Sequence, residues 1–370
     1  MRLEAVLIPI LLASGAAAAA DNAKSAFTQD DARAIVAGVQ KIVSPGGIDE
    51  QKKVTINGSD QWITVRGRDR NNPILLFIHG GPGAPEMPTS WTFQNDWEDW
   101  FTVVQWDQRG SGKTYLANEP AKIAPTVTVP QMVSDAEAMV RYLRAAYRKD
   151  KIFVLGHSWG SFLGLSVARD HPEWLYAYIG MGQIIDSRRS EQLGYEHTLR
   201  AAENAQDAAA IAELRAIAPY PEKDGAVPIE KINVERKWSV KYGGLSWGRD
   251  SYDYYYDAAK LSPDYTDADR AAIGKGSLLS LTRLVKGFTS ADFEHVTRFR
   301  CPIIMFNGRH DDTVSAQVTA DWFARVHAPV KKLIWFENSA HMMQIEEPGR
   351  VLVHLVEDVR PLAEQENESR

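Results

Sequence analysis

Four segments of strand length in this chain are continuously apolar, and this pattern restricts the fold more than any other feature. They span residues 73–80, 101–108, 152–158 and 175–182. A strand with one face in water alternates apolar and polar residues, whereas continuously apolar strands are typical of a parallel sheet covered on both faces. Helical periodicity lies between the segments, most clearly over residues 128–150. The alternation predicts an α/β fold, with a mostly parallel central sheet, helices on both faces and right-handed crossovers.

The alternation of strands and helices is interrupted once. Residues 187–297 contain helical patterns and a polar, aromatic stretch but no apolar segment of strand length, and two further apolar segments follow them. Such an interruption predicts a helical cap inserted above the sheet. We therefore expect an α/β core in two parts, residues 24–186 and 298–363, a helical cap over residues 187–297, and a flexible tail over residues 364–370.

The first residues have the layout of a secretory signal peptide. Arg2 precedes an apolar stretch from residue 5 to residue 12, and a run of small residues ends at Ala20. The apolar stretch is shorter than the roughly 20 residues that span a bilayer. We expect residues 1–20 to be a signal peptide, and the mature protein to be secreted, into the periplasm, with no membrane attachment. The alternative is an alanine-rich disordered leader.

The composition excludes some classes of partner and of site. The net charge is −6 and no long basic run is present, so the chain lacks the electrostatic footprint of a nucleic-acid-binding protein. Cys301 is the only cysteine, so no internal disulfide can form. The histidines and aspartates lack ligand spacing on any one predicted element, so the sequence predicts no metal site.

Ser158 is the candidate nucleophile. It lies in Gly-His-Ser-Trp-Gly, directly after an apolar segment and before a helical pattern. In a G-x-S-x-G turn the serine backbone is strained, and the positions two residues away, here Gly156 and Gly160, are crowded by the strand and the helix. The turn lifts the hydroxyl out of the sheet, where a base can reach it. The alternative is a buried turn serine with no chemical role.

A serine nucleophile needs a histidine that takes its proton and a carboxylate that orients this histidine. In folds with this turn the chain order is serine, acid, histidine. Asp311 follows the apolar segment in "IIMFNGRHD", and His341 follows the one in "LIWFENSAH". Asp312 is the alternative acid; Asp311 is preferred because the first carboxylate after the strand is better placed at its carboxyl end.

Acyl transfer also needs hydrogen-bond donors for the oxyanion. The backbone N–H of Trp159, the residue after the nucleophile, is one predicted donor. The second is expected from the loop after the first apolar segment. Because Pro82 has no N–H, Gly81 is the first candidate and Gly80 the second.

Four motifs together resemble the proline iminopeptidase branch of the α/β-hydrolases. They are "HGGPG" (79–83), "WDQRGSG" (106–112), "GHSWGS" (156–161) and "GRHD" (308–311). The resemblance implies a serine peptidase that removes an N-terminal residue, often proline, without metal or organic cofactor. It also implies that Ser158, Asp311 and His341 are nucleophile, acid and base. Arg109 in the second motif is then expected to tie loops together.

In this branch, carboxylates of the cap hold the free amino group of the substrate. Glu191 is the first candidate, because it opens the first helical pattern of the insertion. Trp247 and Tyr255 belong to an aromatic group that could line an apolar pocket or simply pack within the cap. The predicted substrate is a short peptide or aminoacyl amide, and the alternative is a small ester cleaved by the same three residues. The other acidic candidates are Asp186, Glu196, Asp250, Asp253 and Asp257.

Overall fold

The computed structural model describes residues 26–368 and is built around one sheet of eight strands, in the order β1-β2-β4-β3-β5-β6-β7-β8. Strands β3 to β8 are parallel, and β1 and β2 extend the sheet as an antiparallel hairpin. This confirms the predicted α/β fold. The strands are β1 (Ile48–Ile56), β2 (Ser59–Gly67), β3 (Ile74–Ile78), β4 (Thr102–Asp107), β5 (Ile152–His157), β6 (Leu175–Met181), β7 (Ile303–Gly308) and β8 (Lys331–Phe336).

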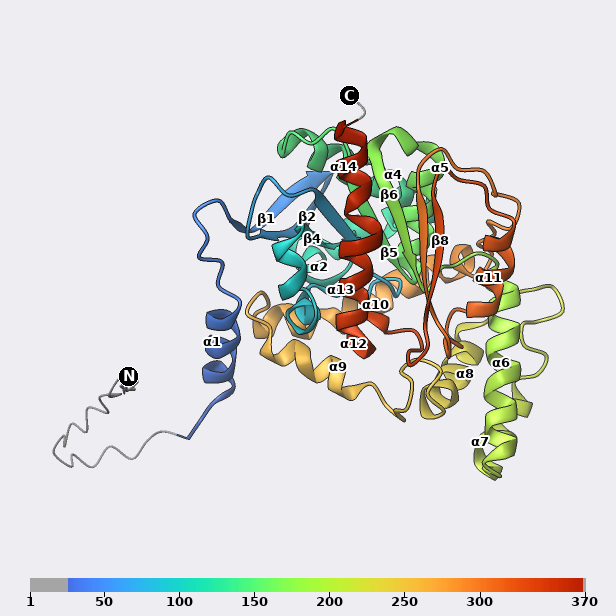
Figure 1. Cartoon of the computed structure of the whole chain (residues 1–370). Helices are drawn as coiled ribbons and strands as arrows, with labels where there is room; N and C mark the ends of the chain where they lie inside the picture. The colour runs from blue at the N-terminus through green and yellow to red at the C-terminus, as the bar shows by residue number, and fades with distance from the viewer. Residues whose placement is uncertain (1–25, 369–370) are drawn as a thin grey trace, which may run out of the picture.

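Helices cover both faces of this sheet (Figure 1). Along β3, Leu76 and Ile78 pack with residues of α4, α5 and α11, whereas Leu75 and Phe77 pack with residues of α12 to α14. Every residue of β3 is buried, which explains why its sequence does not alternate. The covering helices are α4 (Val129–Ala146), α5 (Trp159–Asp170), α11 (Ala316–Ala324), α12 (Met343–Glu346), α13 (Pro348–His354) and α14 (Pro361–Glu368).

A helical cap separates β6 from β7 and has a small apolar core of its own, which includes Leu214 and Trp238. The chain leaves and re-enters the sheet region at one place, where Asp186 and Asp292 form an antiparallel bridge. From there α6 and α7 project away from the sheet (Figure 1). The cap helices are α6 (Ser187–Asn204), α7 (Ala208–Ala216), α8 (Ile229–Lys241), α9 (Asp253–Ala258) and α10 (Asp267–Phe288).

The remaining helices are short and lie mainly before α4. They are α1 (Gln29–Val39), α2 (Gly112–Ala117), α3 (Pro120–Ile123), the 3-10 helices η1 (Met87–Thr92), η2 (Asn95–Asp99), η3 (Ala124–Thr126), η4 (Pro172–Trp174) and η5 (Ala259–Leu261), and the π-helical turn η6 (Leu355–Val359). Helix α1 is attached to the cap, because Arg33 donates to the carbonyl of Lys260 and forms an ion pair with Asp267.

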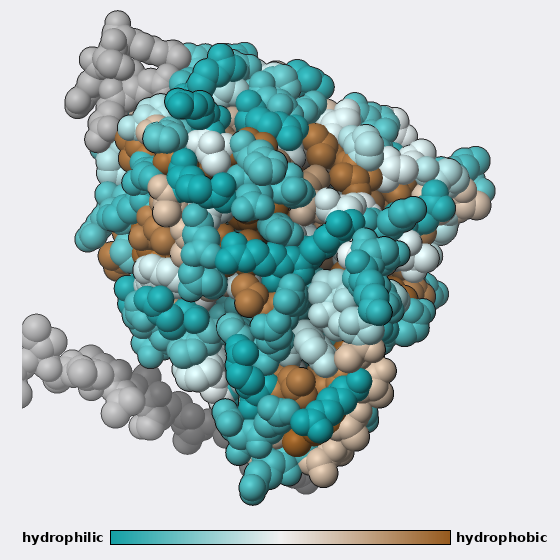
Figure 2. Space-filling view, turned by 90° about the vertical axis from the view of Figure 1, so that its right-hand side faces the viewer, coloured by the Kyte–Doolittle hydropathy of each residue, from teal (hydrophilic) through white to brown (hydrophobic). Residues whose placement is uncertain are grey.

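The described residues begin after the predicted signal peptide and include most of the predicted tail. The predicted signal peptide, residues 1–20, is not among them. At the other end α14 continues to Glu368, so residues 364–368 of the predicted tail are helical. Among the described residues, no helix combines the length and apolar character that crossing a membrane requires. The face from which α6 and α7 project is mostly hydrophilic, with small apolar patches that are ordinary for a protein surface (Figure 2).

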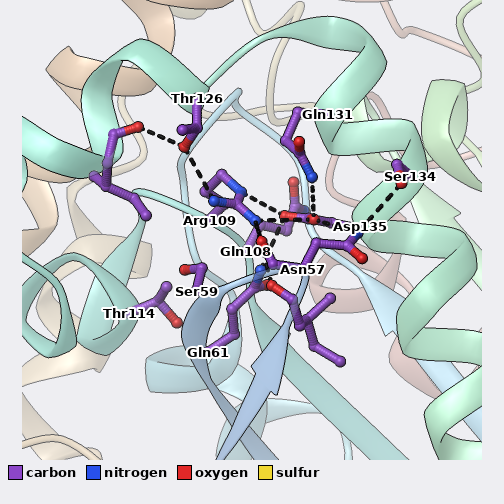
Figure 3. Close-up of polar contacts among 12 residues, drawn as sticks. Asn57, Ser59, Gln61, Gln108, Arg109, Thr114, Thr126, Gln131, Ser134 and Asp135 are labelled. Carbon is purple, nitrogen blue, oxygen red and sulfur yellow. Dashed lines mark hydrogen bonds and ion pairs between the residues drawn. The ribbon is translucent and has the colours of Figure 1, made fainter.

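A buried ion pair joins the loop after β4 to α4 (Figure 3). The Nε and Nη2 atoms of Arg109 lie 2.6 and 3.1 Å from the two carboxylate oxygens of Asp135. Gln61, Gln131 and Asn57 also donate to this carboxylate. Arg109 further donates to the carbonyl of Asn57, so the cluster connects β2, α4 and the β1–β2 turn. The predicted structural role of Arg109 is confirmed.

Replacing Asp135 by alanine should lower the free energy of unfolding by about 3–5 kcal/mol, because the Arg109 charge would stay buried without a partner. Chemical denaturation of the purified variant measures this change. The matched control is Glu294→Ala, which breaks the exposed pair with Arg325 and should leave stability nearly unchanged. Equal effects of the two substitutions would contradict this account.

Candidate active site

Ser158 occupies a sharp turn between β5 and α5. Its backbone has φ 54° and ψ −121°, a conformation that residues other than glycine rarely adopt. The turn is held by a hydrogen bond of 2.9 Å from the Ser158 N–H to the carbonyl of Met181 on β6. A second bond, of 2.8 Å, runs from the Ser161 N–H to the Ser158 carbonyl. The strained turn puts the serine at the carboxyl end of the sheet and at the N-terminus of a helix.

The two motif glycines are required by close backbone contacts. A Cβ atom on Gly160 would overlap the carbonyl oxygen of Ile78 on β3, and one on Gly156 would overlap the carbonyl oxygen of Gly160. Both contacts are closer than real Cβ atoms approach, and the obstructing atoms are main chain, which cannot move aside. The small residues two positions either side of Ser158 therefore allow α5 to start directly against the sheet.

The predicted acid and base meet at the ends of β7 and β8. The Nδ1 atom of His341 lies 2.7 Å from Oδ2 of Asp311, and both side chains are buried. The other oxygen of Asp311 accepts the N–H groups of Thr313 and Val314, at 3.0 and 2.8 Å. The alternative acid, Asp312, instead contacts Nδ1 of His197 at 2.7 Å. The geometry thus favours Asp311 over Asp312.

Several hydrogen bonds fix the loop that carries His341. Its N–H donates to the carbonyl of Leu245 in the cap, at 3.0 Å. The N–H groups of the two flanking residues, Ala340 and Met342, donate to the carboxylate of Glu346. Burial raises the pKa of Glu346 to about 7, although these N–H groups oppose the shift. Sequence reasoning missed Glu346, since nothing in "HMMQIEEP" distinguishes it from its neighbour Glu347.

A cavity of about 250 Å³ contains Ser158 and His341 in its wall, together with Gly80 and Gly81. The structure therefore brings the candidate nucleophile and the candidate base to one cavity. In the described part of the chain the Ser158 hydroxyl forms no hydrogen bond to the His341 ring. In enzymes without substrate this bond is often long and tightens only in the complex.

The predicted oxyanion donors lie around the nucleophile. A Cβ on Gly80 would come within 2.9 Å of the Ser158 Cβ, so this loop passes directly beside the serine. Gly81 has φ +112° and lines the same cavity. Trp159 is the first residue of α5, and its indole is buried and donates to Gln108. His79 bonds the Gly80 carbonyl, and burial lowers its pKa to about 4, so it is a neutral support for the loop.

Of the three predicted substrate-binding residues, only Tyr255 lines this cavity. Trp247 lies outside it, where its ring stacks on His310 with centroids 3.4 Å apart and remains 44% exposed. The Glu191 carboxylate is buried and already bonded to Tyr220 and, at 2.5 Å, to Arg236. It is Arg236 that reaches the cavity wall. Sequence alone could not show which way these cap side chains point.

Glu86 is a cavity residue that sequence reasoning missed. It is 3% exposed and is the single acidic side chain among the described residues that line the cavity. Its oxygens lie 2.5 Å from Nδ1 of His157 and 2.9 Å from the side-chain nitrogen of Gln344. The signal in the sequence was a carboxylate three residues after "HGGPG". A negative charge in a loop beside a predicted oxyanion site would disfavour the oxyanion, so an acidic residue there calls for a partner of its own.

Comparisons with known proteins identify the family of the chain. The family model described as "alpha/beta hydrolase fold" matches residues 73–348. "Probable aminopeptidase YbaC" from Bacillus subtilis is 30% identical over 305 residues, 80% of this chain and 92% of that protein. The structure of a proline iminopeptidase from Mycobacterium smegmatis has a TM-score of 0.63 at 17% identity, over 87% of this chain and 100% of that one. The esterase RhEst1 from Rhodococcus has a TM-score of 0.52 at 14% identity, over 85% and 99%.

The family model covers most of the chain, and the match to the aminopeptidase extends over nearly the whole of that relative. The two solved structures support the fold. The chain is therefore a hydrolase of the α/β-hydrolase family and belongs to its proline iminopeptidase-like branch.

Proposed function

We propose that the chain is a serine hydrolase that removes an N-terminal residue, proline or another small one, from short peptides or aminoacyl amides. The observation that carries the proposal is the bond between Asp311 and His341 at a cavity that also contains the strained Ser158. A carboxylate, an imidazole and a hydroxyl in this arrangement are suited to acyl transfer.

The proposed reaction has two halves. Ser158 attacks the scissile carbonyl while His341 takes its proton, and Asp311 holds the ring so that Nε2 faces the serine. The N–H groups of Trp159 and of Gly81 or Gly80 stabilise the oxyanion. His341 then protonates the leaving amine, and water activated by the same histidine releases the acyl group.

The cavity supports a small substrate. Its volume of about 250 Å³ is below the range of about 300–1,000 Å³ that is usual for drug-sized ligands. Tyr252, Tyr255 and Tyr256 from the cap line one side, and Leu245 and Met342 add apolar surface. Such walls fit one compact apolar residue, and the similarity to an aminopeptidase supports a substrate with a free N-terminus.

A carboxylesterase is the second candidate, favoured by one observation. The cap carboxylate predicted to hold an amine, Glu191, is paired with Arg236 and lies outside the cavity wall. A substrate without an amino group would not need it. The esterase RhEst1 shows that the same fold serves this chemistry.

A substrate panel distinguishes the two candidates. We expect turnover of prolyl- and alanyl-naphthylamide, and kcat/KM at least about 100-fold lower for their N-acetylated forms, which lack the charged amine. The control substrates are p-nitrophenyl acetate and butyrate, with Ser158→Ala as the background enzyme. Hydrolysis of the esters alone would reject the peptidase and establish the esterase.

A further inference from the structure

A buried ion pair lies directly behind the nucleophile and connects three segments of the active site. His157, the residue before Ser158, places Nδ1 2.5 Å from Glu86 and Nε2 3.0 Å from the main-chain carbonyl of His341. Glu86 also accepts a bond of 2.9 Å from Gln344. All these residues are at most 3% exposed. The oxyanion loop, the serine turn and the histidine loop are thus tied together by one carboxylate and one imidazole.

With Glu86 ionised, the contacts of His157 favour a doubly protonated ring. A carboxylate oxygen faces one ring nitrogen and a carbonyl oxygen faces the other, and both are acceptors. Only an imidazolium can donate to both. Burial by itself would lower the pKa of His157, but Glu86 and the His341 carbonyl outweigh it and raise this pKa. Burial would likewise raise the pKa of Glu86, but His157 outweighs it and lowers this pKa. Both shifts therefore favour the ionised form of the pair.

We infer that the Glu86–His157 pair is a positioning device that holds the main chain of His341 in line with Ser158, so that the imidazole faces the hydroxyl. The inference rests on the proposed function. The ring centroids of His157 and His341 are 4.8 Å apart, so the first ring also packs against the second. Glu86 fixes the same loop again through Gln344, one turn further along.

The device predicts a loss of activity at alkaline pH. The charged or titratable groups that face His157 are Glu86, Asp311, His341 and His79. A histidine with a raised pKa keeps its second proton up to that pKa and loses it as the pH rises further. The neutral ring can then donate to Glu86 or to the His341 carbonyl, but not to both. One of the two ties is released, and kcat falls while KM changes little.

The test compares the pH dependence of kcat in the wild type and in Glu86→Gln. The amide keeps the shape and can accept from His157, but the charge that raises the pKa is gone. We expect the alkaline fall of kcat to move down by about 1–3 pH units. At pH 7 kcat should drop about 10- to 100-fold, as expected for a misplaced catalytic group. The 15N shifts of His157 should report an imidazolium at pH 7 in the wild type and a neutral ring in the variant.

Two further variants keep the test decisive. In His157→Gln nothing titrates at this position, so the alkaline fall should disappear. Glu98→Gln is the matched control, because Glu98 is an equally buried carboxylate paired with Arg66 outside the site. It should reduce stability without moving the pH profile.

The outcomes separate the positioning role of the Glu86–His157 pair from the proposed function. An unmoved alkaline limb in Glu86→Gln, or a neutral His157 ring in the wild type at pH 7, would overturn the positioning role. A wild type that hydrolyses neither amides nor esters would instead refute the proposed function, and the 15N shifts would still report whether the ion pair exists.

Discussion

Ser158→Ala is expected to abolish turnover, lowering kcat by about 10⁴–10⁶-fold on whichever substrate the wild type cleaves. Alanine lacks the Oγ atom that would form the acyl bond. The side chains of His341 and Asp311 cannot take the place of this atom as the nucleophile. The fold should survive, because the Ser158 hydroxyl forms no hydrogen bond among the described residues and its backbone bonds to Met181 and Ser161 remain. Steady-state kinetics at matched protein concentration measures the loss.

A covalent probe gives the same prediction a second readout. A fluorophosphonate should label the wild type once, at Ser158, and should not label the alanine variant. The matched control is Ser166→Ala on the same helix, where the hydroxyl bonds, among the described residues, only the carbonyl of Phe162. This variant should label and turn over like the wild type. Labelling of Ser158→Ala at an unchanged rate would show that another residue is the nucleophile.

Asp311→Asn is expected to lower kcat by about 10⁴-fold. An uncharged amide at this position cannot stabilise the imidazolium that forms when His341 takes the serine proton. Its NH₂ group can also force the ring into the tautomer whose proton lies on Nε2, which then cannot act as a base. The two N–H bonds from Thr313 and Val314 can still be made to the amide oxygen, so the loop should keep its shape.

The neighbouring residue offers an unusually close control for this prediction. Asp312→Asn makes the same chemical change one position later, where the carboxylate contacts His197 on the cap and not His341. Its kcat should stay within about threefold of the wild type, because the substitution leaves the Asp311–His341 pair intact. A large loss in Asp312→Asn together with a small one in Asp311→Asn would exchange the roles of the two carboxylates.

Much of the fold could be predicted because strands that are buried on both faces have continuously apolar sequences. Residues such as Leu75, Leu76 and Phe77 are buried on both faces of β3, and a strand covered on both faces accounts for three such residues in a row. The strand order was not predicted, because it depends on which strands pair across the sheet, and β4 lies between β2 and β3 against the order of the chain.

The sequence predicted the site residues whose place follows from the order of strands along the chain. It did not predict which side chains of the cap point into the cavity. Asp311 and His341 were predicted because each follows an apolar segment of strand length; these segments are β7, which is fully buried, and β8, which is buried only in part. Glu191 was expected at the substrate but is neutralised by Arg236, and Trp247 stacks on His310 instead. The sequence shows which residues share one face of a cap helix. It does not show which face turns toward the cavity, because that depends on how the helix packs against its neighbours.

The two segments that enter and leave the cap meet at the sheet, so the cap can change in evolution without a change in the core. These segments lie side by side, joined by the Ser187–Ala291 and Phe293–Ile185 backbone bonds of 3.1 and 2.8 Å. Because the ends already meet, lengthening or exchanging what lies between them adds little closure entropy. Under the proposed function, the cap that lines the substrate cavity is thus a replaceable module. Descendants could acquire new specificities by swapping it while the strands that carry the chemistry stay as they are.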